Sequence, residues 1–173
     1  MPHLSPPTLT HSEQKAILRA TVRNPRDHLI YSLALGTGLR LAEIVGLDVG
    51  DVYTDDRTPR TRLRIRPEIA KGGRKGDVFL PDALMRKLRR FWAHKAQRRE
   101  GLQPRDPLFC SQSRTRISKR RVQFAFELLR LLDRTEMGQG WSAISPPGRW
   151  NYRPRPGNFA LNLKRPIPTS GKL

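Results

Sequence analysis

The chain has 173 residues, enough for one domain with a sizeable core and too few for two. Its 34 lysines and arginines outnumber 15 aspartates and glutamates, so the net charge of +19 favours a polyanion as partner over a small-molecule ligand. The longest apolar stretch, residues 29–35, is far shorter than the roughly 20 residues of a membrane span, so we expect no membrane contact. The start lacks the features of a signal peptide and the single cysteine, Cys110, has no disulfide partner, which predicts a cytoplasmic protein.

Composition divides the chain near residue 138. Residues 138–173 contain six basic and no acidic residues, together with six of the 15 prolines and five of the 13 glycines. They show no sustained period of 2 or 3.6, which is the signal of a strand or a helix. We therefore expect one folded domain over residues 8–137 and a basic, Pro- and Gly-rich, mostly irregular tail over 138–173.

The first part of the domain predicts three helices. Thr10, with Glu13 three residues later, forms a capping box that predicts a helix over 11–23. Asn24 and Pro25 suit the N-cap and first position of a second helix, which the glycines of residues 36–38 end before a third, shorter one. The apolar positions expected to be buried in the second and third helices are Leu29, Ile30, Leu33, Ala34, Leu41, Ile44, Val45 and Leu47.

A hairpin and two longer helices follow. Residues 61–66 alternate leucine and isoleucine with arginine, which predicts a half-buried strand with a basic face. The turn residues 71–76 and the apolar residues 78–80 predict the return strand. An amphipathic helix is expected over 82–97, and Ser118 suits the start of another. The predicted fold is therefore mainly α with a small antiparallel β-hairpin, an α+β class.

The turn at residues 71–76 is rich in glycine and strongly basic. It lacks the glycine and lysine spacing of a P-loop, so it does not predict nucleotide binding. Lys71, Arg74 and Lys75 project from a tight turn and suit contact with a DNA groove or phosphate. The alternative interpretation, an ordinary solvated turn, stays open because exposed turns commonly carry charge.

Arg40 follows the helix break at residues 37–39 and so lies at the mouth of a helix. Glu43 is three residues later on the same face. A carboxylate in that place fixes a guanidinium in one orientation, which suits bidentate binding of a phosphate. An ordinary intrahelical ion pair is the alternative.

A basic cluster surrounds the expected start of the last helix. It consists of Arg114, Arg116, Lys119, Arg120 and Arg121. Cations at a helix N-terminus oppose the helix dipole, so a DNA or RNA backbone is a plausible reason for them, and a solvated basic face is the alternative. The four histidines are scattered and Cys110 is alone, so the sequence predicts no metal site.

The order of these motifs resembles the tyrosine recombinases, the phage integrase family. The matching segments are TGLRLAEI at residues 37–44, Lys71 in a hairpin ending in VFLP at 78–81, and PLF at 107–109. The resemblance spans about residues 8–133 and implies part of a catalytic domain. Members of the family grip double-stranded DNA and cleave one strand with a tyrosine, through a covalent 3′-phosphotyrosyl link and without a metal or other cofactor.

The resemblance also implies roles for individual residues. Arg40 resembles the first catalytic arginine, which neutralises the non-bridging oxygens of the transition state. Lys71 resembles the hairpin lysine, a general acid for the leaving 5′-oxygen, with Lys75 as the alternative if the turn register differs. Glu43 resembles the carboxylate that holds the first arginine. The basic residues of the turn and of the last helix are then expected to bind DNA.

Later motifs of the family are not recognisable. No histidine follows His94, and in residues 145–149 Pro147 stands where the His-x-x-Arg element would begin. Tyr152 is followed closely by Pro154, a context unlike that of the family's nucleophile, so it is not assigned that role. The helical DNA-clamping domain that usually precedes the catalytic domain is also not seen. We therefore expect a truncated or frameshifted, inactive remnant that binds DNA and has an intact recombinase as a second partner. A non-enzymatic basic DNA- or RNA-binding protein is the alternative.

Overall fold

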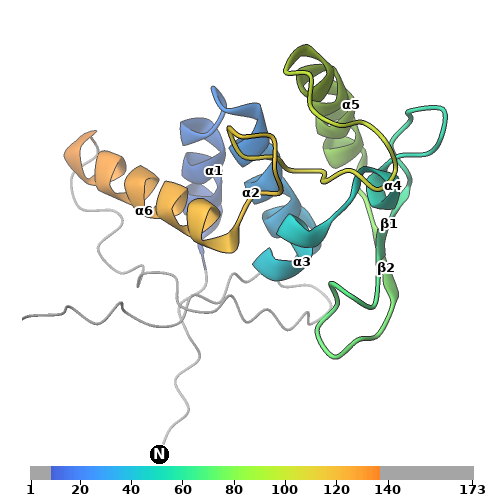
Figure 1. Ribbon diagram of the computed structural model, residues 1–173. Helices are drawn as coiled ribbons and strands as arrows, with labels where there is room; N and C mark the ends of the chain where they lie inside the picture. The colour runs from blue at the N-terminus through green and yellow to red at the C-terminus, as the bar shows by residue number, and fades with distance from the viewer. Residues whose placement is uncertain (1–8, 137–173) are drawn as a thin grey trace, which may run out of the picture.

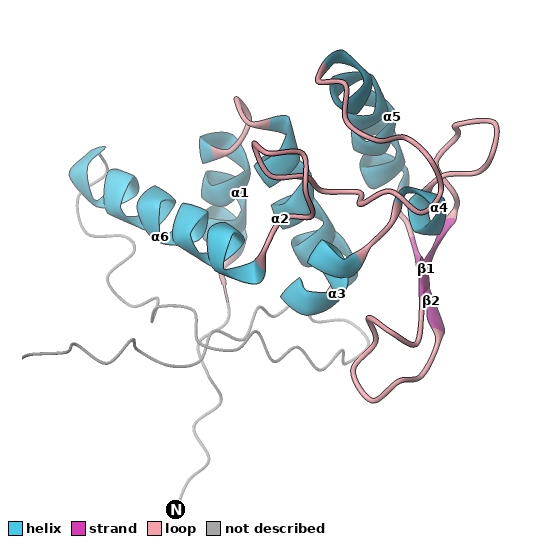
Figure 2. Cartoon of the chain, viewed as in Figure 1, coloured by secondary structure: helices cyan, strands magenta, loops and turns pink. Residues whose placement is uncertain are grey.

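The structure, a computed structural model, describes residues 9–136 and has the predicted architecture: helices beside one small antiparallel hairpin (Figures 1 and 2). The elements in chain order are α1 (His11–Ala20), α2 (Pro25–Thr37), α3 (Leu41–Gly46), α4 (Val49–Val52), β1 (Arg62–Ile65), β2 (Gly76–Phe79), α5 (Asp82–Gln97) and α6 (Lys119–Glu136). The expected tail at 138–173 lies outside the described residues, so the division of the chain at 138 stays a prediction.

The start of α1 confirms the predicted capping box, but its end differs from the prediction. Glu13 Oε2 accepts a hydrogen bond from the Thr10 amide at 2.6 Å, and Thr10 Oγ1 accepts one from the Glu13 amide at 3.3 Å. The helix ends at Ala20 instead of residue 23. Beyond Ala20 the Val22 and Asn24 amides bond to the carbonyls three residues earlier, so the helix ends in a turn. Pro25 disfavours helical dihedrals at the residue before it, and Asn24 accordingly has φ −116° and ψ 94° and caps α2.

Helix α2 is the centre of the core and packs against α1, α5 and α3. All the apolar positions predicted for the second and third helices are buried. The ring of Tyr31 lies 6.0 Å from that of Phe126, and its hydroxyl donates to the Val122 carbonyl at 3.3 Å. These contacts fix the first turns of α6 against α2, as Figure 1 shows.

The hairpin joins β1 and β2 in antiparallel register, with Leu63 opposite Val78. Leu63 is buried while the neighbouring Arg62 and Arg64 are exposed, which confirms a half-buried strand with a basic face. The prediction was wrong for Arg66, which we placed on that exposed face. The strand ends at Ile65, and the Arg66 guanidinium turns back to buried carboxylates described below.

Candidate functional site

Arg40 lies where α2 ends and α3 begins. Gly38 takes a left-handed conformation, φ 69°, which closes α2 and turns the chain so that Arg40 can begin α3. Glu43 Oε2 accepts a hydrogen bond from the Arg40 amide at 2.7 Å, and Glu43 Oε1 lies 3.4 Å from Arg40 Nη1. The carboxylate is 9% exposed and the arginine side chain 29%, so an almost buried acid holds a partly exposed guanidinium.

The hairpin turn brings Lys71 to the same carboxylate. The Lys71 amide donates to Glu43 Oε1 across 3.4 Å, although the two residues are 28 positions apart. The side chains of Lys71, Arg74 and Lys75 are exposed. In Figure 1 the turn that joins β1 and β2 lies below α3. The structure therefore brings Arg40, Glu43 and Lys71 together, with the other two turn cations close along the chain.

A close approach of the turn to α3 supports this arrangement. A Cβ atom at Gly46, the last residue of α3, would lie only 2.6 Å from Cγ2 of Ile69. Real Cβ atoms essentially never approach another heavy atom so closely, and a β-branched side chain has little freedom to move away. The missing side chain at Gly46 therefore lets Ile69, two residues before Lys71, pack on α3.

Arg66, which precedes the turn, binds the C-terminal end of α3, the end opposite Arg40. Its Nε lies 2.9 Å from Asp51 Oδ2, and its Nη2 lies 2.7 Å from Asp48 Oδ2 and donates to the Gly46 carbonyl at 3.0 Å. The carboxyl end of a helix has carbonyls without intrahelical partners, and a guanidinium satisfies them well. The sequence interpretation did not assign this network; its signal is the pair of aspartates Asp48 and Asp51 in an otherwise basic chain.

Arg116 also binds the C-terminal end of α3. Its Nη1 donates to the carbonyls of Val45 and Leu47 at 3.2 and 2.9 Å, and its Nη2 pairs with Asp48. The sequence interpretation placed Arg116 among DNA-binding residues. The structure gives its guanidinium three acceptors within the protein, which hold α3 in place, and its predicted contact with DNA stays a prediction.

The remaining basic residues of that cluster are exposed and lie at or before the start of α6. They are Arg114, Lys119, Arg120 and Arg121. Ser118 Oγ accepts a hydrogen bond from the Arg121 amide at 3.2 Å, which confirms Ser118 as the start of this helix. Because Arg116 contacts the end of α3 and α6 packs against α3, this basic segment lies beside α3.

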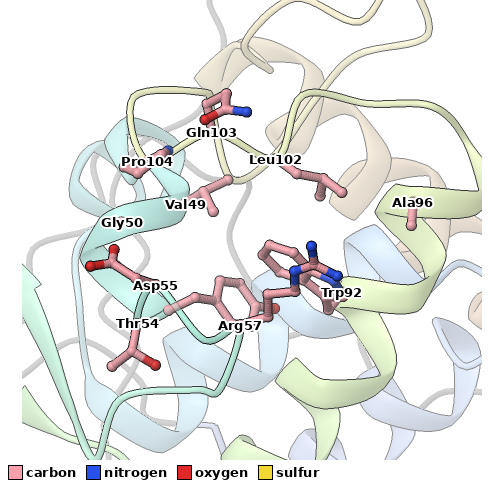
Figure 3. A pocket seen from close by; sticks show the side chains of 11 residues that line it. Val49, Gly50, Thr54, Asp55, Arg57, Trp92, Ala96, Leu102, Gln103 and Pro104 are labelled. Carbon is pink, nitrogen blue, oxygen red and sulfur yellow. The ribbon is translucent and has the colours of Figure 1, made fainter.

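A cavity of about 540 Å³ lies elsewhere, between α4, α5 and the segment that follows α5 (Figure 3). Trp92, Leu102 and Val49 contribute to its lining, and the Trp92 ring packs edge-on against Tyr53 at 4.9 Å. Its lining includes none of the three residues around the Glu43 carboxylate. The candidate site is thus an exposed basic surface and not this hollow.

Within residues 9–136, no group of three or more His, Cys, Asp or Glu side chains is placed to hold a metal ion. None of its helices combines the length and the apolar character needed to cross a membrane.

Residues 7–143 match the phage integrase family. The chain belongs to this family. It is 30% identical over 119 residues to tyrosine recombinase XerC of Caldanaerobacter subterraneus subsp. tengcongensis, covering 67% of this chain and 30% of that relative. It is 31% identical over 98 residues to tyrosine recombinase XerC of Neisseria meningitidis serogroup B, covering 57% of this chain and 29% of the relative. The integrase-family chain described here therefore spans about 30% of the length of these relatives.

Solved integrase-family structures share its fold. The crystal structure of XerA recombinase matches with a TM-score of 0.57 and 19% identity, covering 81% of this chain and 47% of that one. The lambda integrase catalytic core matches with a TM-score of 0.51 and 22% identity, covering 70% and 67%. These matches confirm the resemblance to tyrosine recombinases and the predicted fold class.

The candidate residues of the site all lie within the matched range. The segment 145–149 and Tyr152 lie outside it and outside the described residues.

Proposed function

We propose that this integrase-family domain binds double-stranded DNA in site-specific recombination, with Arg40, Glu43 and Lys71 at the phosphate-binding site. The observation that carries the proposal is the Glu43 carboxylate, which accepts the amides of both Arg40 and Lys71. A guanidinium held by a carboxylate loses less freedom when it binds, which favours bidentate contact with a phosphate. The exposed ammonium of Lys71 supplies a second cation beside it.

The roles follow from the chemistry of phosphoryl transfer. Arg40 neutralises the non-bridging oxygens of the scissile phosphate, and Glu43 positions Arg40. Lys71, with Lys75 as the alternative, donates a proton to the leaving 5′-oxygen. The flanking DNA backbone is bound by the other exposed cations of the two basic segments: Arg74, Arg114, Lys119, Arg120 and Arg121.

We further propose that this chain does not complete strand cleavage by itself. Forming the phosphotyrosyl link needs several cations on the equatorial oxygens, and the loss of one such group costs on the order of 10² to 10³ in rate. The sequence has no histidine after His94, so it offers no recognisable His-x-x-Arg element. In this proposal the domain acts on DNA together with an intact recombinase, which supplies the missing groups.

DNA binding is tested by fluorescence anisotropy with unrelated duplexes at several salt concentrations. We expect a log–log slope of about −0.9 for each phosphate neutralised, and a slope smaller by about one for Arg40→Ala and for Lys71→Ala. Arg89→Ala, which removes an exposed charge from α5, is the matched control and should leave the slope unchanged. Equal slopes for all three variants would reject the assigned site.

Strand cleavage is tested with nicked duplexes that have randomised flanks. We expect no band of protein covalently linked to DNA on a denaturing gel. An adduct formed by the wild-type chain and lost in Tyr152→Phe would show that the chain has its own nucleophile.

A further inference from the structure

A second basic surface lies at the opposite end of α2 from Arg40. It is a pocket of about 320 Å³ at the start of α2 and the start of α6, lined by the four arginines Arg23, Arg26, Arg98 and Arg121. Helix α2 has 13 residues, so at about 1.5 Å per residue this pocket lies roughly 20 Å along the helix from Arg40. It is therefore separate from the proposed phosphate-binding site around Arg40, although Arg121 also belongs to the flanking DNA contacts proposed above.

Two of these arginines are held in place by internal contacts. Arg26 Nε lies 2.8 Å from Asp27 Oδ1, and Arg26 Nη1 donates to the Cys110 carbonyl at 3.1 Å. Arg98 Nε donates to Glu100 Oε1 at 2.9 Å. Within residues 9–127, whose side chains the structure describes, the second Nη of Arg26 and both Nη groups of Arg98 have no acceptor. Such fixed guanidinium groups with unused donors bind a carboxylate at a low cost in conformational entropy.

The pocket has an excess of positive charge. Its one lining carboxylate, Glu100, is buried and also pairs with the buried Lys95 at 3.2 Å. Neither Arg23 nor Arg121 has a carboxylate within ion-pair distance in the described part of the chain. An acidic ligand therefore neutralises charge that the protein leaves unbalanced.

Exposed apolar side chains border the pocket. Phe124 is 57% exposed, and the guanidinium carbon of Arg121 lies 5.6 Å from the centre of its ring. Val22, which precedes Arg23, is 63% exposed. Aromatic and arginine side chains together are typical of protein–protein contacts, whereas the DNA backbone offers phosphates and sugars. The combination favours a protein ligand over a second DNA duplex.

The segments outside the described residues carry no acidic side chain. Every one of the 15 acidic residues lies at or before Glu136, and residues 1–8 and 137–173 contain none. We infer that the pocket binds an acidic segment of a partner protein, with carboxylates against Arg23, Arg26 and Arg98 and an apolar side chain against Phe124. The inference is independent of the proposed DNA site, because the two surfaces share no residue except Arg121.

The test is a comparison of two charge-matched variants with two ligands. The peptide probe is a fluorescein-labelled segment of aspartates and glutamates around a single tryptophan, and the second ligand is duplex DNA. The pocket variant is Arg23→Ala with Arg98→Ala, and the control variant is Arg74→Ala with Lys75→Ala. At about 0.15 M salt we expect the pocket variant to lose about tenfold in peptide affinity and the control variant to lose less than about twofold.

Further readouts separate the alternatives. Phe124→Ser should weaken binding of the tryptophan-containing peptide. It should not weaken binding of a second peptide that has serine in place of the tryptophan. DNA affinity should fall in the control variant and not in the pocket variant. Equal losses of peptide affinity in both variants would overturn the inference, since they indicate general charge attraction. Loss of DNA affinity in the pocket variant would assign the pocket to DNA. Dimerisation of the wild-type chain in sedimentation, lost in the pocket variant, would show that the occupant is a second copy. None of these outcomes decides the proposed role of Arg40, which the anisotropy experiment with Arg40→Ala tests separately.

Discussion

Glu43 lies within hydrogen-bonding distance of the Lys71 backbone, with 3.4 Å between Glu43 Oε1 and the amide nitrogen. The same carboxylate accepts the Arg40 amide at 2.7 Å. One almost buried acid therefore ties the start of α3 to the hairpin turn. Any change at Glu43 is expected to reach both basic residues at once.

Glu43→Ala should lower the free energy of unfolding by about 1–2 kcal/mol, because the Arg40 amide loses its capping acceptor. Glu43→Gln keeps a carbonyl oxygen in that place and should cost less. Urea unfolding followed by far-UV circular dichroism measures both. Glu68→Ala, at an exposed acid, is the control, and a loss in Glu43→Ala no larger than in this control would contradict the capping role.

Gly46→Ala should push the hairpin turn away from α3, because the added Cβ meets Ile69 at 2.6 Å. Overpacking of this kind typically costs about 1–3 kcal/mol. The double variant Gly46→Ala with Ile69→Ala removes the collision and should recover part of that stability. If the two single changes were simply additive in a double-mutant cycle, the contact between Gly46 and Ile69 would not be the cause.

Asp48→Ala removes the carboxylate shared by Arg66 and Arg116 and should lower the free energy of unfolding by roughly 1–3 kcal/mol. The carboxylate is only 14% exposed, but its partners are 35% and 40% exposed, so solvent compensates part of the loss. Asp55→Ala, at an exposed acid of the following loop, is the control for urea unfolding. Equal stability of these two variants would show that the network contributes nothing measurable.

The local features of this fold could be predicted from the sequence because neighbouring residues determine them. The capping box of Thr10 and Glu13, the helix start at Pro25 and the glycine ending of α2 each involve contacts a few residues apart. The alternation in β1 likewise shows which of its side chains are buried. Residues near in sequence thus predict where elements begin and end.

The network around Asp48 could not be predicted in this way. Arg66 meets Asp51 across 15 positions, and Arg116 meets Asp48 across 68. From sequence alone, each arginine is one more cation in a basic chain. Only the packing of the turn and of the segment before α6 against α3 distinguishes them from cations that face solvent.

Tyr53 should make the fold sensitive to alkali. Burial raises the pKa of Tyr53 above its ordinary value of about 10, and its hydroxyl donates to the Leu88 carbonyl at 2.8 Å. Above about pH 10 the unfolded chain releases this proton while the folded chain keeps it, so stability falls as pH rises, by up to about 1.4 kcal/mol per pH unit. Burial also raises the pKa of Tyr31. Tyr53→Phe should therefore reduce the alkaline slope in urea unfolding without abolishing it, and an unchanged slope would show that Tyr53 does not contribute.

Cys110 should react with a thiol reagent only when the fold opens. Its side chain is buried, with the residue 1% exposed, and burial raises the pKa of the thiol, so little of the reactive thiolate forms near neutral pH. Labelling with Ellman's reagent should be slow in native buffer, rapid in urea, and should follow the unfolding curve, because the chain has a single cysteine. Raising the pH should accelerate labelling of the unfolded chain at a lower pH than that of the folded chain. Cys110→Ser, which has no thiol, gives the background signal of the labelling assay. Rapid labelling of the native chain, at the rate found in urea, would show that the segment between α5 and α6 opens without global unfolding.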